Sequence, residues 1–379
     1  MERSKLISVL VLTSSRADFG IYLPLLNRLK KDSQFNLKIL AFGTHLSISH
    51  GYTLNQINEA GFAADFQISS LLANDASEDI ATSYALTSLK FTDFWLLFKN
   101  QFDWVFVLGD RFEMAAAVAA GIPFNIPFAH IHGGETTLGA IDNIYRHFIT
   151  LSSKLHFVAL EEYRTRIHKL LESSTNNCNV IGALSLENLQ EIKLLNHGEF
   201  KEKWSIDLEL PSILITVHPE TVEFSKNGDY SLEIYKALKK LSQDRQLIIT
   251  MPNADTKGSV FRKVYEKLKA QQPNKVFLIE NFGTQSYFTC MKYVGLMIGN
   301  TSSGIIEAAS FKKYVLNVGD RQKGRIAGDN VVHLPFDSET IINEANIYFN
   351  KSFEEGNIYD KGGAVDIILE KLKEYAAIS

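Results

Sequence analysis

The sequence predicts an α/β protein with two doubly wound parallel sheets in tandem. A chain of 379 residues is longer than one hydrophobic core usually fills, so two domains of about 150–200 residues each are expected. Short apolar or β-branched runs recur, each followed by a longer stretch of helical periodicity, and this rhythm starts again at Ser212. Strands that alternate with helices, with no hairpin turn between them, are typical of parallel sheets covered by helices on both faces.

Ten buried strands follow from these runs. In the first half they cover residues 6–12, 37–42, 104–108, 126–131 and 155–159. In the second half they cover residues 213–217, 246–250, 275–279, 295–298 and 314–318. We therefore expect a Rossmann-like sheet in each half. Open sheets of this kind bind ligands at the carboxyl ends of their strands, so the chemistry is expected in a central cleft that both domains face.

The expected domains are an N-terminal domain over residues 1–180 and a C-terminal domain over residues 181–360. Residues 361–379 contain an amphipathic helix, at 365–377, that we expect to pack back on the first domain. The polar stretch 199–211 follows a helical segment at 186–195 and loses its apolar periodicity, which makes it the candidate linker.

Composition and charge exclude several classes of protein. The chain is 45% apolar and 22% charged, which is ordinary for a folded protein. A net charge of −4, without a basic cluster, argues against nucleic acid as a partner. The apolar run before Ser14 is too short for a signal peptide or a membrane span, so we expect a cytoplasmic protein without a membrane partner. The two cysteines, Cys178 and Cys290, are expected to be buried or idle thiols.

The first strand runs into a polar turn at residues 13–20 that precedes a helix expected to start near Ile21. The free N–H groups of that helix would favour an anion, and Arg16 could add a bidentate contact to a phosphate or carboxylate. The alternative is that Arg16 is a surface side chain paired with Asp18.

Asp110 ends the strand at 104–108 and precedes an alanine-rich helix at 114–120. It is a candidate proton-transfer group at the mouth of the sheet, or alternatively the N-cap of that helix. Arg111 and Glu113 complete this run.

The segment 130–142 is the richest in candidate groups. It carries two histidines, an adjacent pair of glycines and two carboxylates, at His130, His132, residues 133–134, Glu135 and Asp142. Glycines let the backbone approach a ligand closely, and the carboxylates supply proton transfer. A metal site lacks the expected further ligands, and His130 could equally be a core residue.

Three strand ends in the second half also carry polar or aromatic candidates. His218 follows the strand at 213–217 and is a plausible phosphate donor, and Asn253 follows the strand at 246–250. The loop with Phe282 and Gly283 could cover a nucleobase with its aromatic ring.

Residues 299–304, which include Ser302 and Ser303, join the strand at 295–298 to a helix expected to start near Ile305. Their small side chains and free N–H groups at a helix N-terminus suit a diphosphate. Glu307, expected one turn into that helix, could accept ribose hydroxyls or merely favour the helix dipole.

The cationic loop at 320–325 contains Arg321 and Arg325. It could neutralise phosphate charge or be a solvated charge run.

These motifs, in this order, resemble the hydrolysing UDP-N-acetylglucosamine 2-epimerases that supply sialic acid and legionaminic acid synthesis. The resemblance covers nearly the whole chain and rests on the Arg16 turn and on residues 109–113, 130–142, 218–220, 299–304 and 321–325. It implies a GT-B fold and a reaction that needs neither metal nor nicotinamide. UDP is eliminated to give a 2-acetamidoglucal, water is added, and N-acetylmannosamine is released together with UDP.

The resemblance also implies roles for individual residues. Asp110 and Asp142 match catalytic acids of the family, and either His132 or Glu135 completes the acid–base set. Members of the sialic acid branch often have glutamate at the position of His132. A histidine at this position resembles the legionaminic branch instead. The sugar could therefore be UDP-2,4-diacetamido-2,4,6-trideoxyglucose. The diphosphate would bind Arg16, His218, Ser302, Ser303, Arg321 and Arg325, and the uridine Asn253, Phe282, Gly283 and Glu307. Arg111 is expected to be a further substrate-binding residue.

Members of the family are commonly homodimers or homotetramers, and the apolar helix at 77–100 is a possible interface or part of the core. Three rival functions share parts of this pattern. A GT-B glycosyltransferase would need an acceptor groove and fewer proton-transfer groups. A non-hydrolysing epimerase would differ around residues 130–135. A nucleotide-sugar sensor would have lost the acids that this chain retains.

Overall fold

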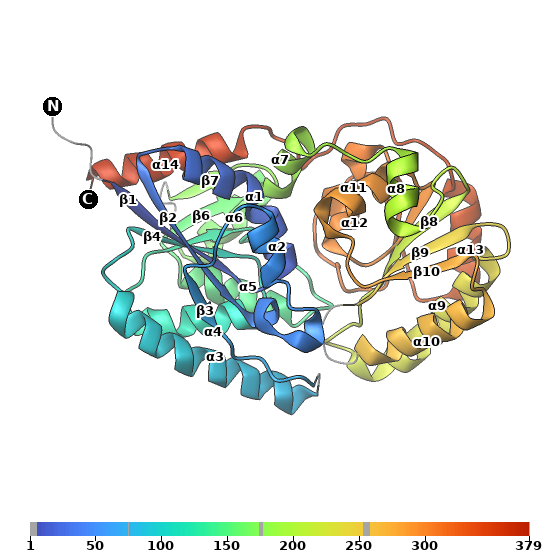
Figure 1. Cartoon of the computed structure of the whole chain (residues 1–379), viewed down its shortest axis with the longest axis horizontal. Coiled ribbons are helices and arrows are strands. Elements are labelled where there is room, and N and C mark those ends of the chain that lie inside the picture. Colours follow the sequence, from blue (N-terminus) through green and yellow to red (C-terminus); the bar gives the residue numbers. More distant parts are fainter. Residues whose placement is uncertain (1–5, 75, 174–176, 253–257, 379) are drawn as a thin grey trace. The chain divides into compact units, whose positions relative to one another are not determined.

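The computed structural model describes residues 6–74, 76–173, 177–252 and 258–378. Its contacts divide the chain into two compact units. The first unit consists of Met1–Glu135, Asp142–Glu191 and Lys361–Ser379, and the second of Thr136–Ile141 and Ile192–Asp360. Each unit is a parallel sheet with helices on its faces (Figure 1).

The first unit contains a seven-stranded sheet in the order β3-β2-β1-β4-β5-β6-β7. Every pairing is parallel, and the chain reverses its direction of travel across the sheet between β1 and β4. That reversal is a topological switch point, where open α/β sheets place ligand sites. The strands are β1 Ile7–Thr13, β2 Phe35–Phe42, β3 Phe66–Ile68, β4 Trp104–Leu108, β5 Phe128–Ile131, β6 Leu155–Val158 and β7 Cys178–Val180.

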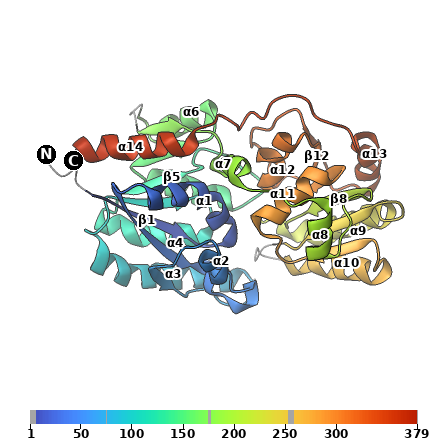
Figure 2. The same cartoon turned by 45° about the horizontal axis from the view of Figure 1, so that its top comes forward.

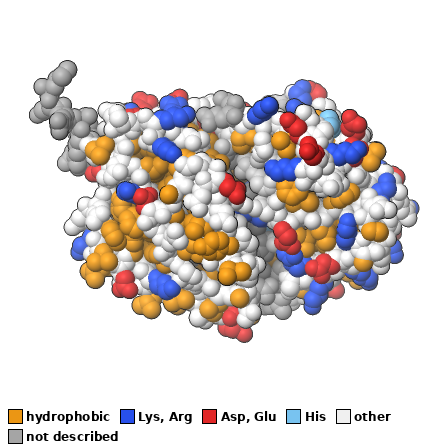
Figure 3. Space-filling model, viewed as in Figure 1, with side chains coloured by type: hydrophobic (Ala, Val, Ile, Leu, Met, Phe, Trp, Pro, Cys, Tyr) orange, Lys and Arg blue, Asp and Glu red, His pale blue; other side chains and the backbone are white. Residues whose placement is uncertain are grey.

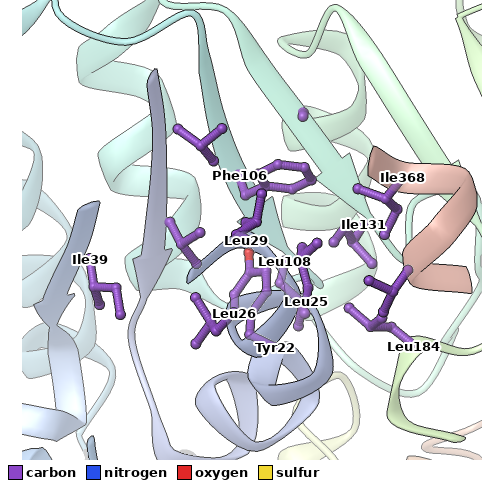
Figure 4. Packing of buried hydrophobic residues seen from close by; sticks show 14 of the residues in the cluster. Tyr22, Leu25, Leu26, Leu29, Ile39, Phe106, Leu108, Ile131, Leu184 and Ile368 are labelled. Carbon is purple, nitrogen blue, oxygen red and sulfur yellow. The ribbon is translucent and has the colours of Figure 1, made fainter. Parts of the chain in front are cut away.

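Helices cover both faces of this sheet, and a separate apolar cluster fills each interface. Figure 4 shows the cluster in which α1, α7 and the C-terminal helix α14 meet the sheet, with Leu25, Leu184 and Ile368 among its labelled side chains. The helices α3, α4 and α5 pack on the opposite face around Trp95 and Met114. The helices of the unit are α1 Arg16–Lys31, α2 Leu54–Glu59, α3 Ser77–Phe98, α4 Phe112–Gly121, α5 Asp142–Leu151, α6 Glu161–Leu170, α7 Leu184–Glu191 and α14 Ala364–Ile378.

The second unit contains a six-stranded parallel sheet in the order β10-β9-β8-β11-β12-β13. Its strands are β8 Ser212–Thr216, β9 Gln246–Thr250, β10 Val276–Ile279, β11 Leu296–Gly299, β12 Val315–Val318 and β13 Val331–Leu334. Figure 2 shows the helices of this unit from a second direction. They are α8 His197–Trp204, α9 Asn227–Leu241, α10 Gly258–Gln271, α11 Gly283–Tyr293, α12 Ser302–Ile306 and α13 Ser338–Tyr348.

All ten predicted strands form, with ends within two residues of those expected. The pattern misses β3, β7 and β13, each an outermost strand of three or four residues. Partial burial explains the omission of β3 and β13, because their side chains alternate weakly between core and solvent.

Helix ends differ more, and the capping residues explain why. The helix α1 begins at Arg16 rather than near Ile21, because Ser15 caps it by accepting from the N–H of Asp18. The stretch 199–211 was expected to lack regular structure, but its first part belongs to α8, which a capping box between Asn196 and Glu199 initiates.

Both cysteines are buried, as predicted, and burial raises the pKa of the Cys178 thiol to about 12. In the described ranges, no helix is long and apolar enough to cross a membrane.

His130 on β5 and His156 on β6 are paired in register, and neither is exposed. Burial lowers the pKa of His130 to about 3 and that of His156 to about 4. Neither ring nitrogen of His156 has a hydrogen-bond partner within the part of the chain described. The folded protein therefore holds both imidazoles neutral.

Stability should fall as the pH drops below about 6.5, because the unfolded chain then binds protons that the folded protein excludes. For His156 the loss between pH 7 and pH 5 is about 2 kcal/mol. Urea unfolding of His156→Phe should show a correspondingly weaker pH dependence, whereas His333→Gln, at an exposed site on β13, should keep it. Equal pH dependence of His156→Phe and the wild type would contradict this account.

Candidate active site

Asp110 and Arg111 follow β4 through a turn at Gly109, whose φ is +71°. The Asp110 carboxylate forms an ion pair with Arg146, which α5 contributes. The N-cap position of α4 is Arg111, so Asp110 does not serve as its cap. The guanidinium of Arg111 binds the Glu113 carboxylate through two hydrogen bonds of 2.8 and 3.2 Å. Burial of Glu113 raises the pKa of its carboxyl group.

His132 lies directly after β5 with a φ of +65°, a left-handed conformation that is rare and costly for a residue with a Cβ. Its Nδ1 lies 2.9 Å from Oε1 of Glu135, which is only 1% exposed. Its Nε2 has no hydrogen-bond partner in the described ranges. The backbone thus holds a histidine in an unfavourable conformation, with one ring nitrogen bound to a carboxylate. Such strain is typical of functional sites.

Arg146 connects these groups. Its side chain is 1% exposed, and it pairs with Asp110 through Nη2 while Nη1 donates to the carbonyl of Glu135 at 3.1 Å. Asp142 is the first residue of α5 and lies four residues before Arg146, so both occupy one face of the helix. One buried guanidinium therefore connects Asp110 to Glu135, which in turn holds His132, and Asp142 lies one turn before it on α5.

The two glycines after His132 are required by close packing. A Cβ on Gly134 would lie 2.5 Å from the carbonyl oxygen of Tyr163, and one on Gly133 would lie 3.0 Å from Nδ1 of His130. His130 itself is buried and hydrogen-bonds with the carbonyl of Gly109 at 2.8 Å. It joins the ends of β4 and β5, which is a structural role.

At the end of β1, the Asp18 carboxylate accepts from the N–H and the hydroxyl of Ser14, at 3.0 and 2.6 Å. Arg16 is the first residue of α1 and is half-buried. The hydrogen bonds to Asp18 therefore fix the turn, and Arg16 lies at the N-terminus of α1.

In the second unit, Asn300 organises the strand ends. Its side chain accepts from the N–H of His218 at 2.7 Å and donates to the carbonyl of His218 at 2.9 Å, which joins β8 to β11. The Asn300 carbonyl accepts from Gln322 at 3.0 Å. His218 and the loop of Arg321 and Arg325 are thus held beside one another. Sequence reasoning missed the roles of Asn300 and Arg146, because burial of a polar side chain leaves no periodic signal.

Ser302 and Ser303 lie in the first turn of α12, which Thr301 caps. The helix begins at Ser302 rather than near Ile305 and has five residues. Glu307 is its C-cap, one turn from its start, and the Glu307 N–H donates to the carbonyl of Ser303 at 2.9 Å. Tyr287 on α11 was not predicted; burial raises the pKa of its hydroxyl to about 12.

The ring of Phe282, which is predicted to cover a nucleobase, lies among aromatic side chains of the second unit. The ring is 6% exposed and packs on Phe200 and Trp204 of α8, at centroid distances of 5.7 and 4.8 Å. The main chain beside it remains open, because no atom lies within 4 Å of a Cβ built on Gly283. Asn253 lies outside the described residues. Within those residues, no three side chains are grouped as metal ligands.

Residues 27–373 match the sequence family described as UDP-N-acetylglucosamine 2-epimerase. The chain belongs to this family. The predicted family is therefore confirmed, and so is the GT-B fold with its two Rossmann-like sheets.

Three comparisons show where the chain stands among the UDP-N-acetylglucosamine 2-epimerases. It is 35% identical to a GDP/UDP-N,N'-diacetylbacillosamine 2-epimerase (hydrolyzing) of Campylobacter jejuni, over 90% of this chain and 86% of that protein. It is 32% identical to the polysialic acid biosynthesis protein P7 of Escherichia coli, over 97% and 96%. The crystal structure of the Neisseria meningitidis UDP-GlcNAc 2-epimerase bound to UDP-GlcNAc has the same fold, with a TM-score of 0.79 at 21% identity, over 97% of this chain and all of that one.

Replacement of Arg146 should destabilise the protein, because it leaves the Asp110 carboxylate and the Glu135 carbonyl without their buried partner. We expect Arg146→Met to lower the free energy of unfolding by about 2–3 kcal/mol. Arg28→Met removes an exposed ion pair with Asp366 from the same unit and should cost less than about 1 kcal/mol. Urea denaturation measures both, and equal losses would contradict the role assigned to Arg146.

Proposed function

We propose that this protein is a hydrolysing 2-epimerase that converts UDP-N-acetylglucosamine and water to N-acetylmannosamine and UDP. The observation that carries the proposal is the cluster of Asp110, Asp142 and the His132–Glu135 pair around Arg146. Membership of the UDP-N-acetylglucosamine 2-epimerase family supports the same chemistry.

The reaction needs several proton-transfer groups in one pocket. In the first step a base removes the proton on carbon 2, the bond between carbon 1 and the phosphate oxygen breaks, and UDP leaves with the electron pair. In the second step water adds its oxygen to carbon 1 of the 2-acetamidoglucal, and a proton returns to carbon 2 from the opposite face. No net oxidation occurs. Each transfer requires a positioned acid or base.

The first unit would supply these groups. Asp110 and Asp142 are the proposed acid–base pair for the two faces of carbon 2, with Asp110 oriented by its ion pair to Arg146. If Glu135 is ionised, it accepts from Nδ1–H of His132, which leaves Nε2 as a proton acceptor. In this arrangement His132 exchanges the proton and Glu135 sets its tautomer.

The second unit would hold the nucleotide. His218, Ser302, Ser303, Arg321 and Arg325 are the proposed diphosphate ligands, and Asn300 joins two of the loops that carry them. Glu307, Asn253 and the main chain at Phe282 and Gly283 are proposed for the uridine. In the first unit, Arg16 remains a proposed diphosphate ligand, and Arg111 would first have to leave Glu113.

A second candidate substrate is UDP-2,4-diacetamido-2,4,6-trideoxyglucose. The 35% identity to the Campylobacter jejuni diacetylbacillosamine 2-epimerase and the presence of His132 favour it, while the 32% identity to the Escherichia coli polysialic acid protein favours the N-acetylglucosamine type. The substituents at carbons 4 and 6 separate the two.

Incubation of the protein with each UDP-sugar, and with the GDP form of the second, tests the proposal. Mass spectrometry of the products should show a free 2-epimerised sugar and the nucleoside diphosphate from one substrate. Recovery of a UDP-linked 2-epimer without free sugar would replace the hydrolysing reaction by the non-hydrolysing one. Inactivity on all three substrates would contradict the proposal.

Asp110→Asn and Asp142→Asn should each lower kcat by at least about 10²-fold, the scale of general acid–base catalysis. Asp244→Asn, at an exposed carboxylate in the turn before β9, makes the same chemical change and should leave kcat unaltered. Near wild-type turnover in both of the first two variants would refute their assignment.

We also propose that the protein is a homo-oligomer assembled through α3. Leu89, Leu96 and Leu97 are 66%, 60% and 70% exposed on one face of that helix. Hydrophobic side chains gather on this side of the first unit in Figure 3. Sedimentation should give at least twice the 42.6 kDa chain mass for the wild type and for Leu210→Glu, and a monomer for Leu96→Glu. A monomeric wild type would contradict the proposal.

A further inference from the structure

Six residues between two candidate catalytic groups belong to the other unit of the chain. Glu135 and Asp142 are part of the first unit, whereas the intervening Thr136–Ile141 clusters with the second. We call Thr136–Ile141 the crossing segment. Its two ends are therefore joined covalently to the proposed acid–base residues.

Hydrogen bonds attach the crossing segment to two loops of the second unit. The N–H of Leu138 donates to the carbonyl of Lys323 at 2.9 Å. The N–H of Thr221 donates to the carbonyl of Gly139 at 3.3 Å, and the N–H of Ile141 donates to the Thr221 hydroxyl at 2.9 Å. Thr221 thus binds the segment through both its backbone and its side chain.

The crossing segment packs closely against the 320–324 loop at two glycines. A Cβ on Gly139 would lie 2.3 Å from the carbonyl oxygen of Asp320 and 2.7 Å from the backbone nitrogen of Arg321. A Cβ on Gly324 would lie 2.8 Å from Cγ2 of Thr136. A displacement of the 320–324 loop must therefore displace the segment.

The turn at residues 218–221 supports both the crossing segment and the candidate diphosphate ligands. It begins at His218, and Glu220 is 3% exposed. The Glu220 carboxylate accepts from the N–H of Asp320 at 2.6 Å and from the backbone of Arg321. Thr221, the next residue, holds the segment. One turn therefore sets the positions of His218, of the Arg321 loop and of the segment.

Hydrogen bonds also attach the chain immediately before the crossing segment to the first unit. Arg146 donates to the carbonyl of Glu135 at 3.1 Å, and Arg166 donates to the carbonyl of Gly134 at 2.7 Å. The change from one unit to the other thus takes place across the peptide bond between Glu135 and Thr136.

We infer that Thr221 is a positioning residue for catalysis, which makes the placement of Glu135 and Asp142 depend on the diphosphate-binding loops of the second unit. The inference rests on the proposed function. A nucleotide that orders His218 and the Arg321 loop also orders the crossing segment, and through it the backbone on which Glu135 and Asp142 are mounted. Thr221 contributes to turnover without contacting the substrate.

The test compares Thr221→Val, which keeps the shape but removes the acceptor for Ile141, with Thr221→Ser, which retains the hydroxyl. Thr221→Val should lower kcat about 5- to 10-fold, the value of one hydrogen bond, while UDP affinity by calorimetry changes less than about twofold. Thr221→Ser should restore most of the loss. Gly139→Ala should lower kcat about 10²-fold, the scale of a displacement near 1 Å, whereas Gly228→Ala, in open space, should have no effect.

Hydrogen exchange gives a readout that does not depend on turnover. Addition of UDP should slow exchange in the peptide that covers residues 136–141 of the wild type and of Thr221→Ser, but not of Thr221→Val. Binding of UDP without protection of this peptide, or a wild-type kcat in Thr221→Val, would overturn the inference and leave the proposed function standing. A wild type that fails to bind UDP would overturn the proposed function and the inference with it.

Discussion

The buried guanidinium of Arg146 is the interaction on which the arrangement of the candidate site depends. It pairs with Asp110 at the end of β4 and donates to the Glu135 carbonyl beyond β5, and α5 places Asp142 one turn before it. Burial of such a cation is unfavourable unless its donors are satisfied, so the two strand ends and the helix are held in one geometry. Within that geometry the backbone of His132 is left-handed, and a hydrogen bond to Glu135 orients its ring.

In the second unit a neutral side chain, that of Asn300, joins the strand ends. Asn300 uses its amide to join β8 to β11 at His218, and its carbonyl receives Gln322 from the cationic loop. Its amide hydrogen-bonds to the backbone of His218, and so fixes the turn that carries this candidate diphosphate ligand. Because the crossing segment is bound to these same loops, the two halves of the proposed chemistry are linked through the chain itself.

The sequence was sufficient for the architecture, because buried parallel strands appear as continuous apolar runs between helical stretches. The sequence was less informative about helix starts, edge strands and buried polar contacts, because capping residues and burial determine these. Ser15 starts α1 earlier than the periodicity suggests, and edge strands such as β13 are too short and too exposed to stand out. The candidate acid–base residues could be proposed from the sequence because polar side chains follow its predicted strands. The roles of Arg146 and Asn300 could not be predicted, because they come from burial among polar partners. The burial of the Phe282 ring was not predicted, because α8, which packs on it, was itself unexpected.

The central claim is that the carbon 2 proton is removed and replaced while the bond to the nucleotide is lost. The most direct measurement is NMR of the sugar formed from UDP-N-acetylglucosamine or its diacetamido-trideoxy relative in deuterated water. The account predicts a free sugar of inverted configuration with deuterium at carbon 2, released together with UDP. A free sugar that keeps its original proton at carbon 2 would contradict it.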